Sequence, residues 1–327
     1  MSAAVPERSV QVRDAAERNP APYSAPTSLA DVLDAMASGA MPLAGGTDLV
    51  VGHRQGKRLL PASLVNLDRV VDLRGIATDS GGSLLIGALT NHEMIVSDER
   101  VRANYPALAD ASSIVGSVAT RATGTIGGNV MNASPAADTI AALLCHDAVA
   151  VLRSNAGERR VPLDELFVGP GRTTASAGEL LVRIELAPSS ATTGGSYVRL
   201  EYRRQMEIAI VGAAAVVRLD ASGRVDYARV AMTALTPTIQ RVPAAEQALL
   251  GTDAGGTAAR AAGEAVAAAA RPISDVRGSA NYRRAMAAVI TQRAVTAAAT
   301  RARGGDVRIP ASDSTFGGSA GSEGSGS

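Results

Sequence analysis

The chain has 327 residues, of which 46% are apolar and only 2% aromatic, and its formal net charge is +1 at pH 7. This length is enough for one large domain or for two to three small ones, and the apolar fraction supports a sizeable core. The near-zero charge argues against electrostatic binding to DNA or to anionic membranes, and the scarcity of rings argues against a protein that stacks nucleic-acid bases.

Few residues of this chain are suited to holding a metal. Its one cysteine, Cys145, excludes a disulfide framework and any four-cysteine iron–sulfur or zinc site within the chain, and the three histidines fit no metal-ligand spacing. Residues 1–22 lack the apolar core of a signal peptide, and no apolar run reaches the length of about 18 residues that a membrane span requires. We therefore expect a cytoplasmic protein with no metal site and no membrane span.

The pattern up to residue 78 is that of a small α/β subdomain. Ser28 followed three residues later by Asp31 predicts the start of a helix, and the apolar residues that follow have helical spacing. Short apolar segments at 64–67 and around Ile76 predict short parallel strands.

A second, larger subdomain is predicted to follow, with a glycine-rich segment at 124–138 in its middle. The elements predicted around that segment are helices at 91–97 and 105–119, strands at 148–153 and 180–186, and a hairpin turn at 155–157.

After a Gly194-Gly195 turn the pattern changes to strands and then to alanine-rich helices, which predicts a separate α+β domain. Its expected elements are three antiparallel strands at 197–202, 209–219 and 225–234, and helices at 256–271 and 280–303. The whole division is a disordered arm (1–22), a first subdomain (23–78), a second subdomain (79–190), the α+β domain (195–303) and a flexible Gly/Ser tail (304–327).

Two glycine turns carry the strongest chemical signal. The segment from Gly124 to Asp138 combines three glycines with hydroxyl, amide and carboxylate side chains, and Gly45-Gly46 forms a second turn upstream. Glycine lets a backbone approach a ligand closely, and the free N–H groups at the start of a helix attract a phosphate. Neither segment has the spacing of a Rossmann fingerprint or a P-loop, so we expect a dinucleotide that is held from two sides in another way.

Together the two segments resemble a known family. Ala-Gly-Gly-Thr-Asp-Leu at 44–49 and Gly-Thr-Ile-Gly-Gly-Asn-x-x-Asn-x-Ser-Pro-x-x-Asp at 124–138 are similar to the paired motifs of the FAD-binding, medium subunit of the molybdenum hydroxylases. That family includes xanthine dehydrogenase and aerobic carbon monoxide dehydrogenase. Further similar segments follow in the same order at 179–186, 197–209 and 279–294, so the resemblance covers roughly residues 22–303.

The resemblance implies a two-part α/β FAD-binding domain of the vanillyl-alcohol-oxidase/PCMH type, followed by a smaller α+β domain with a three-stranded antiparallel sheet. It implies that the first loop wraps the FAD pyrophosphate, that Asp138 binds ribose or adenine donors, and that Arg199 lies beside the isoalloxazine. The cofactor-binding residues that it implies are Leu43, Ala44, Gly45, Gly46, Thr47, Asp48, Leu49, Thr125, Ile126, Gly127, Gly128, Asn129, Asn132, Asp138, Leu181, Tyr197 and Arg199.

The resemblance also implies an electron-transfer function. A large partner subunit would oxidise the substrate at a molybdopterin cofactor, and two [2Fe–2S] clusters on a small subunit would pass electrons to FAD on this chain. FAD would then reduce an external acceptor, and the three subunit types would pair into a dimer of heterotrimers. We expect no catalytic residue in this chain. Two alternatives stay open: a stand-alone FAD-dependent oxidoreductase of the related cell-wall reductase type, and a binding module that has lost its flavin.

Overall fold

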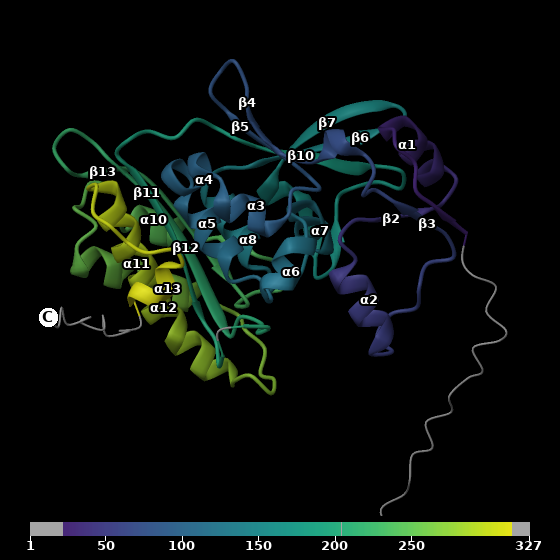
Figure 1. Cartoon of the computed structure of the whole chain (residues 1–327). Coiled ribbons are helices and arrows are strands. Elements are labelled where there is room, and N and C mark those ends of the chain that lie inside the picture. The colour runs from purple at the N-terminus through teal and green to yellow at the C-terminus, as the bar shows by residue number, and fades with distance from the viewer. Residues whose placement is uncertain (1–21, 204, 316–327) are drawn as a thin grey trace, which may run out of the picture.

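The computed structural model describes residues 22–203 and 205–315 (Figure 1). The strands form sheets of three, five, four and two strands, with helices packed between and around them. Almost all of the predicted N-terminal arm lies outside the described residues. No helix in the described part of the chain has the length and apolar character needed to cross a bilayer.

The N-terminal unit is a three-stranded sheet in the order β1-β3-β2, and its strands are parallel, as predicted for the strand at 64–67. Ser28 caps the first helix by accepting from the N–H group of Asp31 at 3.2 Å, and this helix buries Val32, Leu33 and Met36. The elements are β1 (Tyr23–Ser24), α1 (Leu29–Ala37), β2 (Met41–Leu43), α2 (Thr47–Arg54), β3 (Leu64–Asn66) and the 3-10 helix η2 (Val71–Leu73).

The second sheet has five antiparallel strands in the order β4-β5-β10-β6-β7. The strand around Ile76 belongs here and is antiparallel, which corrects the prediction of a parallel strand. Gly82 has a φ of 84°, and this turn folds the chain back, so the two strands beside it can only pair antiparallel. The predicted hairpin at 155–157 is confirmed, since Ser154 pairs with Gly157. The strands are β4 (Ile76–Thr78), β5 (Leu84–Gly87), β6 (Val149–Ser154), β7 (Gly157–Pro162) and β10 (Leu180–Leu186).

Short helices lie between this sheet and the next one. The single helix predicted at 105–119 is two helices, because Gly116 adopts a φ of 54° and Ser117 caps a new helix by accepting from Thr120. The helices are α3 (His92–Ser97), α4 (Glu99–Asn104), α5 (Pro106–Ser113), α6 (Val118–Thr123), α7 (Ile126–Asn132) and α8 (Asp138–Cys145). The connection to β10 adds α9 (Leu163–Leu166) and the paired strands β8 (Phe167–Gly169) and β9 (Arg172–Thr173).

The C-terminal sheet has four antiparallel strands, β11-β12-β13-β14, where three were predicted. The additional strand has only two residues, too few to give an alternating pattern. Helices α5 and α8 pack on one face of the sheet and α12 packs on β11 and β12 (Figure 1). The elements are β11 (Thr193–Leu200), β12 (Val211–Leu219), β13 (Val225–Thr233), β14 (Gln240–Arg241), α10 (Pro243–Gln247), α11 (Gly256–Ala269) and α12 (Ala280–Ala302).

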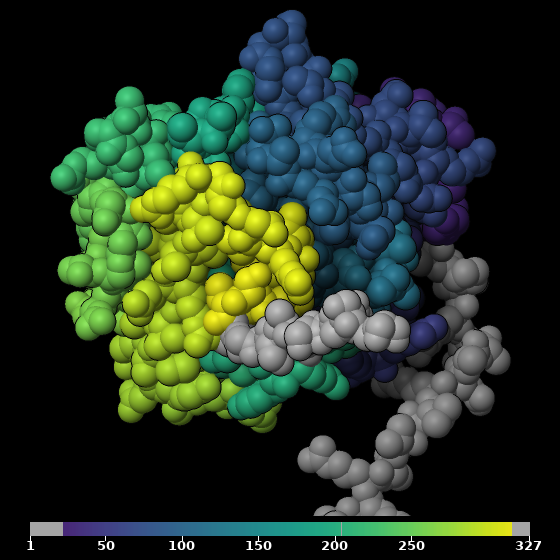
Figure 2. All heavy atoms as spheres, turned by 60° about the vertical axis from the view of Figure 1, so that its left-hand side comes forward, coloured from purple at the N-terminus to yellow at the C-terminus, as the bar shows by residue number. Residues whose placement is uncertain are grey.

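The prediction of a flexible tail at 304–327 is wrong for residues 307–315. Residues 307–315 pack back onto the protein and end in the helix α13 (Ala311–Thr315), and Ala311 is fully buried. Its backbone N–H donates to Asp110, a buried carboxylate of α5, at 3.0 Å. Figure 2 shows this yellow C-terminal end lying against the blue helices of the first half. Residues 316–327 lie outside the described part of the chain.

Asp110 joins the two halves of the molecule. Its carboxylate accepts both terminal nitrogens of Arg301 on α12, at 2.7 and 3.0 Å, and also the backbone N–H of Tyr197 on β11 at 3.1 Å. Both side chains of this ion pair are buried: the exposed fraction is 0% for Asp110 and 9% for Arg301. Breaking one partner of a buried pair leaves a charge without compensation, which is strongly destabilising.

We predict that Asp110→Asn lowers the free energy of unfolding by about 3 kcal/mol, because Arg301 then stays buried without a counter-charge. Denaturant unfolding followed by circular dichroism measures this. The matched control is Asp226→Asn, which breaks the half-exposed pair with Arg218 and should change stability by less than about 1 kcal/mol. Equal effects of the two variants would contradict the role given to Asp110.

Candidate functional site

The first glycine turn links β2 to α2 and leaves a row of backbone N–H groups free. Gly46 precedes α2 with a φ of 68°, which glycine adopts without strain, and no side chain caps this helix. Within the described part of the chain, none of the N–H groups from Gly45 to Leu49 has a hydrogen-bond acceptor. Such a row at the positive end of a helix dipole is suited to an anion such as a pyrophosphate.

The second glycine segment also starts a helix, but the N–H groups of its glycine pair are already used. Those of Ile126 and Gly127 donate to backbone carbonyls beside β5 at 3.0 and 2.9 Å, and that of Gly128 donates to the capping hydroxyl of Thr125 at 3.1 Å. In this structure the N–H groups of Ile126 to Gly128 therefore bond within the protein and do not face an anion. A Cβ on Gly127 would lie 2.7 Å from that of Ala88, so this glycine allows α7 to pack closely on the neighbouring backbone.

The structure brings the two segments into contact. A Cβ added to Gly45 would overlap the carbonyl oxygen of Thr123, and one added to Gly124 would lie 3.6 Å from the hydroxyl of Thr47. Glycine at position 45 is therefore required by the close approach of another backbone, and the free N–H row lies directly beside the second segment. The prediction of two adjoining loops is confirmed in this respect.

Two amide side chains of α7 face its neighbours. Asn129 accepts from the hydroxyl of Thr139 at 2.7 Å, which ties α7 to α8 and leaves the amide nitrogen of Asn129 free for another partner. Asn132, at the end of α7, accepts from Arg58 at 3.5 Å, so the segment after α2 also reaches this helix. Both asparagines are partly exposed.

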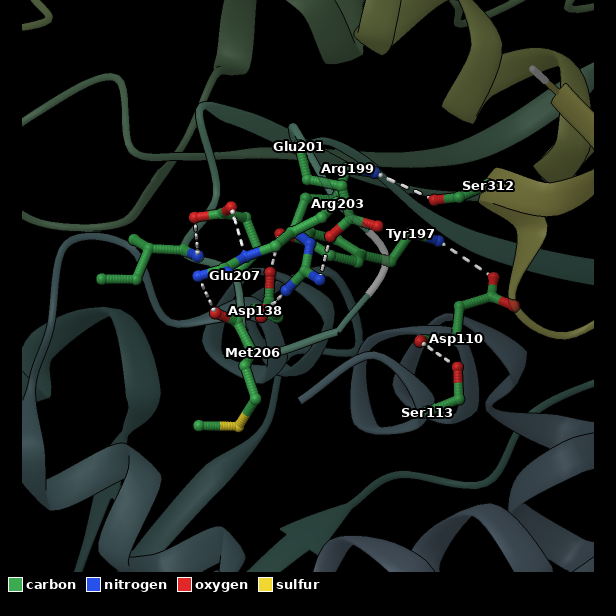
Figure 3. A network of polar contacts seen from close by, with 11 residues as sticks. Asp110, Ser113, Asp138, Tyr197, Arg199, Glu201, Arg203, Met206, Glu207 and Ser312 are labelled. Carbon is green, nitrogen blue, oxygen red and sulfur yellow. Dashed lines mark hydrogen bonds and ion pairs between the residues drawn. The ribbon is translucent and has the colours of Figure 1, made fainter. Parts of the chain in front are cut away.

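Asp138 begins α8 and joins a buried network with the C-terminal sheet (Figure 3). One carboxylate oxygen accepts from the hydroxyl of Tyr197 at 2.7 Å, and the other accepts from the guanidinium of Arg199 at 2.8 Å. Arg199 also pairs with Glu201, and its backbone N–H donates to the hydroxyl of Ser312 at 3.2 Å. The network therefore connects the helix that follows the second glycine segment to β11 and α13.

Burial sets the protonation of this network. Burial first, and then the charge of Asp138, raises the pKa of the Tyr197 hydroxyl well above its usual value, so this group stays a donor. Burial also raises the pKa of both carboxyls, opposed by the charge of Arg199 in each case. With both carboxylates ionised, Asp138, Arg199 and Glu201 together carry a net charge of about −1. Arg199 is thus neutralised within the protein.

Surface access divides the candidate residues into two groups. A buried side chain offers little surface to a ligand unless its neighbours move. The buried candidates are Thr125, Ile126, Gly127, Asp138, Leu181, Tyr197 and Arg199. The candidates that reach the surface are Leu43, Ala44, Gly45, Gly46, Thr47, Asp48, Leu49, Gly128, Asn129 and Asn132.

Sequence reasoning missed two residues of the buried network. Glu201 follows Arg199 by two positions, and alternation along a strand was a usable signal that the two side chains share a face. Gly212 lies opposite Arg199 on β12, and a Cβ there would overlap the hydroxyl of Tyr197. Nothing in the sequence near this glycine indicates that it makes room for a side chain from another strand.

Cys145 and His92 fit structural roles. Burial raises the pKa of the Cys145 thiol and lowers that of His92 to about 4, with Arg121 adding to the latter shift. The thiol is fully buried and stays protonated, so it is not a nucleophile. The His92 ring packs against Gly124, the first residue of the second glycine segment.

The sequence matches two family models that together span most of the chain. Residues 15–189 match the FAD-binding domain in molybdopterin dehydrogenase, and residues 196–298 match the C-terminal domain of the carbon monoxide dehydrogenase flavoprotein. This chain belongs to the family of FAD-binding subunits of the molybdopterin dehydrogenases. FAD is its cofactor, and the predicted family and fold class are confirmed, apart from the strand count of the C-terminal sheet.

Curated relatives agree over nearly their full length. The medium chain of carbon monoxide dehydrogenase from Hydrogenophaga pseudoflava is 33% identical over 282 residues, which cover 85% of this chain and 97% of the relative. The xanthine dehydrogenase FAD-binding subunit of Escherichia coli O157:H7 is 30% identical over 288 residues, covering 87% of this chain and 98% of the relative.

Solved structures share the fold. Carbon monoxide dehydrogenase from Hydrogenophaga pseudoflava superposes with a TM-score of 0.81 at 34% identity, over 86% of this chain and 97% of that one. Quinoline 2-oxidoreductase from Pseudomonas putida 86 superposes with a TM-score of 0.79 at 30% identity, over 86% and 97% of the two chains.

The free N–H row fits the cofactor of the family. FAD carries two negative charges on its pyrophosphate, and the donors from Gly45 to Leu49 have no other described acceptor. The missing Cβ of Gly45 is what allows this row to lie against Thr123. The geometry thus provides one strong anion position between two backbone segments.

We predict that Gly45→Ala abolishes FAD retention, because the added methyl group overlaps the backbone of Thr123 and must push the two segments apart. Flavin released on denaturation, counted per polypeptide, measures this. The matched control is Gly52→Ala in the same helix, where the new Cβ meets only the Arg58 side chain at 3.5 Å or more. That variant should keep its flavin and gain up to about 1 kcal/mol of helix stability. Full occupancy in Gly45→Ala would show that the close approach is not needed.

Proposed function

We propose that this chain is the electron-transfer subunit of a molybdenum-containing hydroxylase or dehydrogenase complex. It would take electrons from [2Fe–2S] clusters of a small partner subunit and deliver them through FAD to an external acceptor. A large partner would carry the molybdopterin cofactor, and the assembly would be a dimer of heterotrimers. The near-complete coverage of relatives that are named medium chains or FAD-binding subunits supports this assignment.

The observation that carries the proposal is the free N–H row from Gly45 to Leu49 against the second glycine segment. We place the FAD pyrophosphate on this row, where the helix dipole of α2 adds to the backbone donors. Bound FAD supplies exchange of one or two electrons, and the protein supplies position and electrostatics.

We assign direct contacts to the surface-reaching candidates and supporting roles to the buried ones. Leu43–Leu49 and Gly128 would line the pyrophosphate, and the free amide nitrogen of Asn129 would donate to a cofactor oxygen. Asp138 holds Tyr197 and Arg199 with both carboxylate oxygens, so it would position the helix that carries it.

Electrostatics favour a supporting role for Arg199 as well. A free cation beside a flavin stabilises its anionic reduced form, but this guanidinium is paired with Asp138 and Glu201. Its side chain is only 1% exposed. We therefore propose that Arg199 fixes β11 against α8 and does not set the flavin potential by its own charge.

Electron flow through this chain gives the test. The intact complex is reduced with dithionite and mixed with an external acceptor, and cluster re-oxidation is followed by its visible absorbance. We predict that a flavin-free complex carrying Gly45→Ala re-oxidises at least about tenfold more slowly than wild type. The complex with Gly256→Ala on α11, where a new Cβ meets nothing within 4 Å, is the control and should match wild type.

Reconstitution separates loss of flavin from loss of structure. Wild-type complex stripped of FAD should show the slow rate, and added FAD should restore the fast one. Equal rates with and without FAD would contradict electron transfer through this chain. An active flavoprotein that purifies without partner subunits would instead favour the stand-alone oxidoreductase.

A further inference from the structure

Helix α2 contains no buried residue and projects beside α6 and α7 in Figure 1. Its described contacts with those helices lie at its start, at Thr47, and in the segment after it, at Arg58. It has only eight residues and includes two valines and a glycine, which are poor helix formers. A helix of this length is marginal in water without packing against a partner.

Large apolar side chains on this segment are left in solvent. Val50 and Val51 are 42% and 48% exposed, and Leu59 and Leu60 are 91% and 44% exposed. Single exposed apolar residues are ordinary, but four within eleven positions of one segment mark an interaction surface.

Positive charges surround these apolar residues. Arg54, Lys57 and Arg58 are exposed, and none of them forms an ion pair with any described residue. Asp48 is the only acidic residue between 47 and 60, so the segment carries a net charge of about +2 at neutral pH. Unpaired cations at the rim of an apolar patch complement an acidic protein surface and speed the encounter with it.

We infer that residues 50–60 form a docking surface for an acidic redox protein, which under the proposed function is the iron–sulfur partner. The segment continues directly from the free N–H row at the start of α2, and the helix is only about 12 Å long at 1.5 Å per residue. A partner seated here would lie beside the proposed pyrophosphate position and thus next to the cofactor that it must reduce. We name this surface the α2 face.

Association with the iron–sulfur subunit that the proposed function assigns to this chain tests the inference. The full chain, loaded with FAD, is titrated with that protein by calorimetry at low and high salt. Reversing the double charge, Arg54→Glu with Lys57→Glu, should raise the Kd at least about tenfold at low salt, and the difference should shrink at high salt. The neutral pair Arg54→Gln with Lys57→Gln should fall in between.

A matched control carries the same change of charge elsewhere. Arg260 on α11 and Arg284 on α12 also lack a carboxylate partner among the described residues, and reversing both should leave the Kd within about twofold of wild type. Leu59→Asp tests the apolar part and should weaken binding at both salt concentrations, because its contribution is not screened.

Three outcomes would contradict the assignment of the α2 face as the docking surface for the iron–sulfur partner. The first is an equal Kd for the reversed pair and for the control pair. The second is loss of FAD in the reversed pair, which would assign Arg54 and Lys57 to the cofactor site. The third is self-association of the wild-type chain that the reversal abolishes, because the occupant is then a second copy. Wild-type flavin content is measured separately, so an absence of FAD contradicts the proposed function and not the docking surface.

Discussion

The close approach of Gly45 to the backbone of Thr123 is the contact on which the site depends. It places a row of unpaired N–H groups at the start of α2 directly beside the segment that begins α7. A side chain at position 45 would separate the two segments, so one missing methyl group controls the geometry of the anion position. The second segment contributes rigidity. The N–H groups of Ile126 and Gly127 hold α7 on the backbone beside β5, and that of Gly128 bonds to the capping hydroxyl of Thr125. The first segment therefore leaves N–H groups free, and the second uses those of Ile126 to Gly128 for its own structure.

Rigidity of the second segment extends to the C-terminal half through buried polar groups. The Asn129–Thr139 bond ties α7 to α8, and Asp138 at the start of α8 holds Tyr197 and Arg199 on β11. The backbone N–H of the same Tyr197 reaches Asp110, which pairs with Arg301. Buried polar networks of this kind are costly when one member is lost, which makes the relative placement of the two halves specific. The site is thus built on a scaffold that spans both family domains.

Patterning and motifs predicted much of this structure. The helix start at Ser28, the parallel strands near it, the hairpin at 155–157 and the two adjoining glycine segments all follow from local rules that the structure obeys. The errors arose where tertiary contacts decide. The segment at 307–315 has little periodicity. It packs on the protein because Ala311 donates its N–H to Asp110 and enters a hydrophobic cluster of the C-terminal domain. Burial of Tyr197 and Arg199 likewise depends on a missing Cβ at Gly212 and on partners far along the chain, which a motif does not reveal.

Hydrogen exchange of single backbone amides tests whether the first glycine turn holds the pyrophosphate. The N–H groups from Gly45 to Leu49 have no acceptor in the described part of the chain, whereas those of Ile126 to Gly128 are already bonded. We predict that adding FAD to the flavin-free chain slows exchange at 45–49 strongly and leaves 126–128 protected to a similar degree in both states. Unchanged exchange at 45–49, with new protection at another anion position, would contradict the assignment of the pyrophosphate to the first glycine turn.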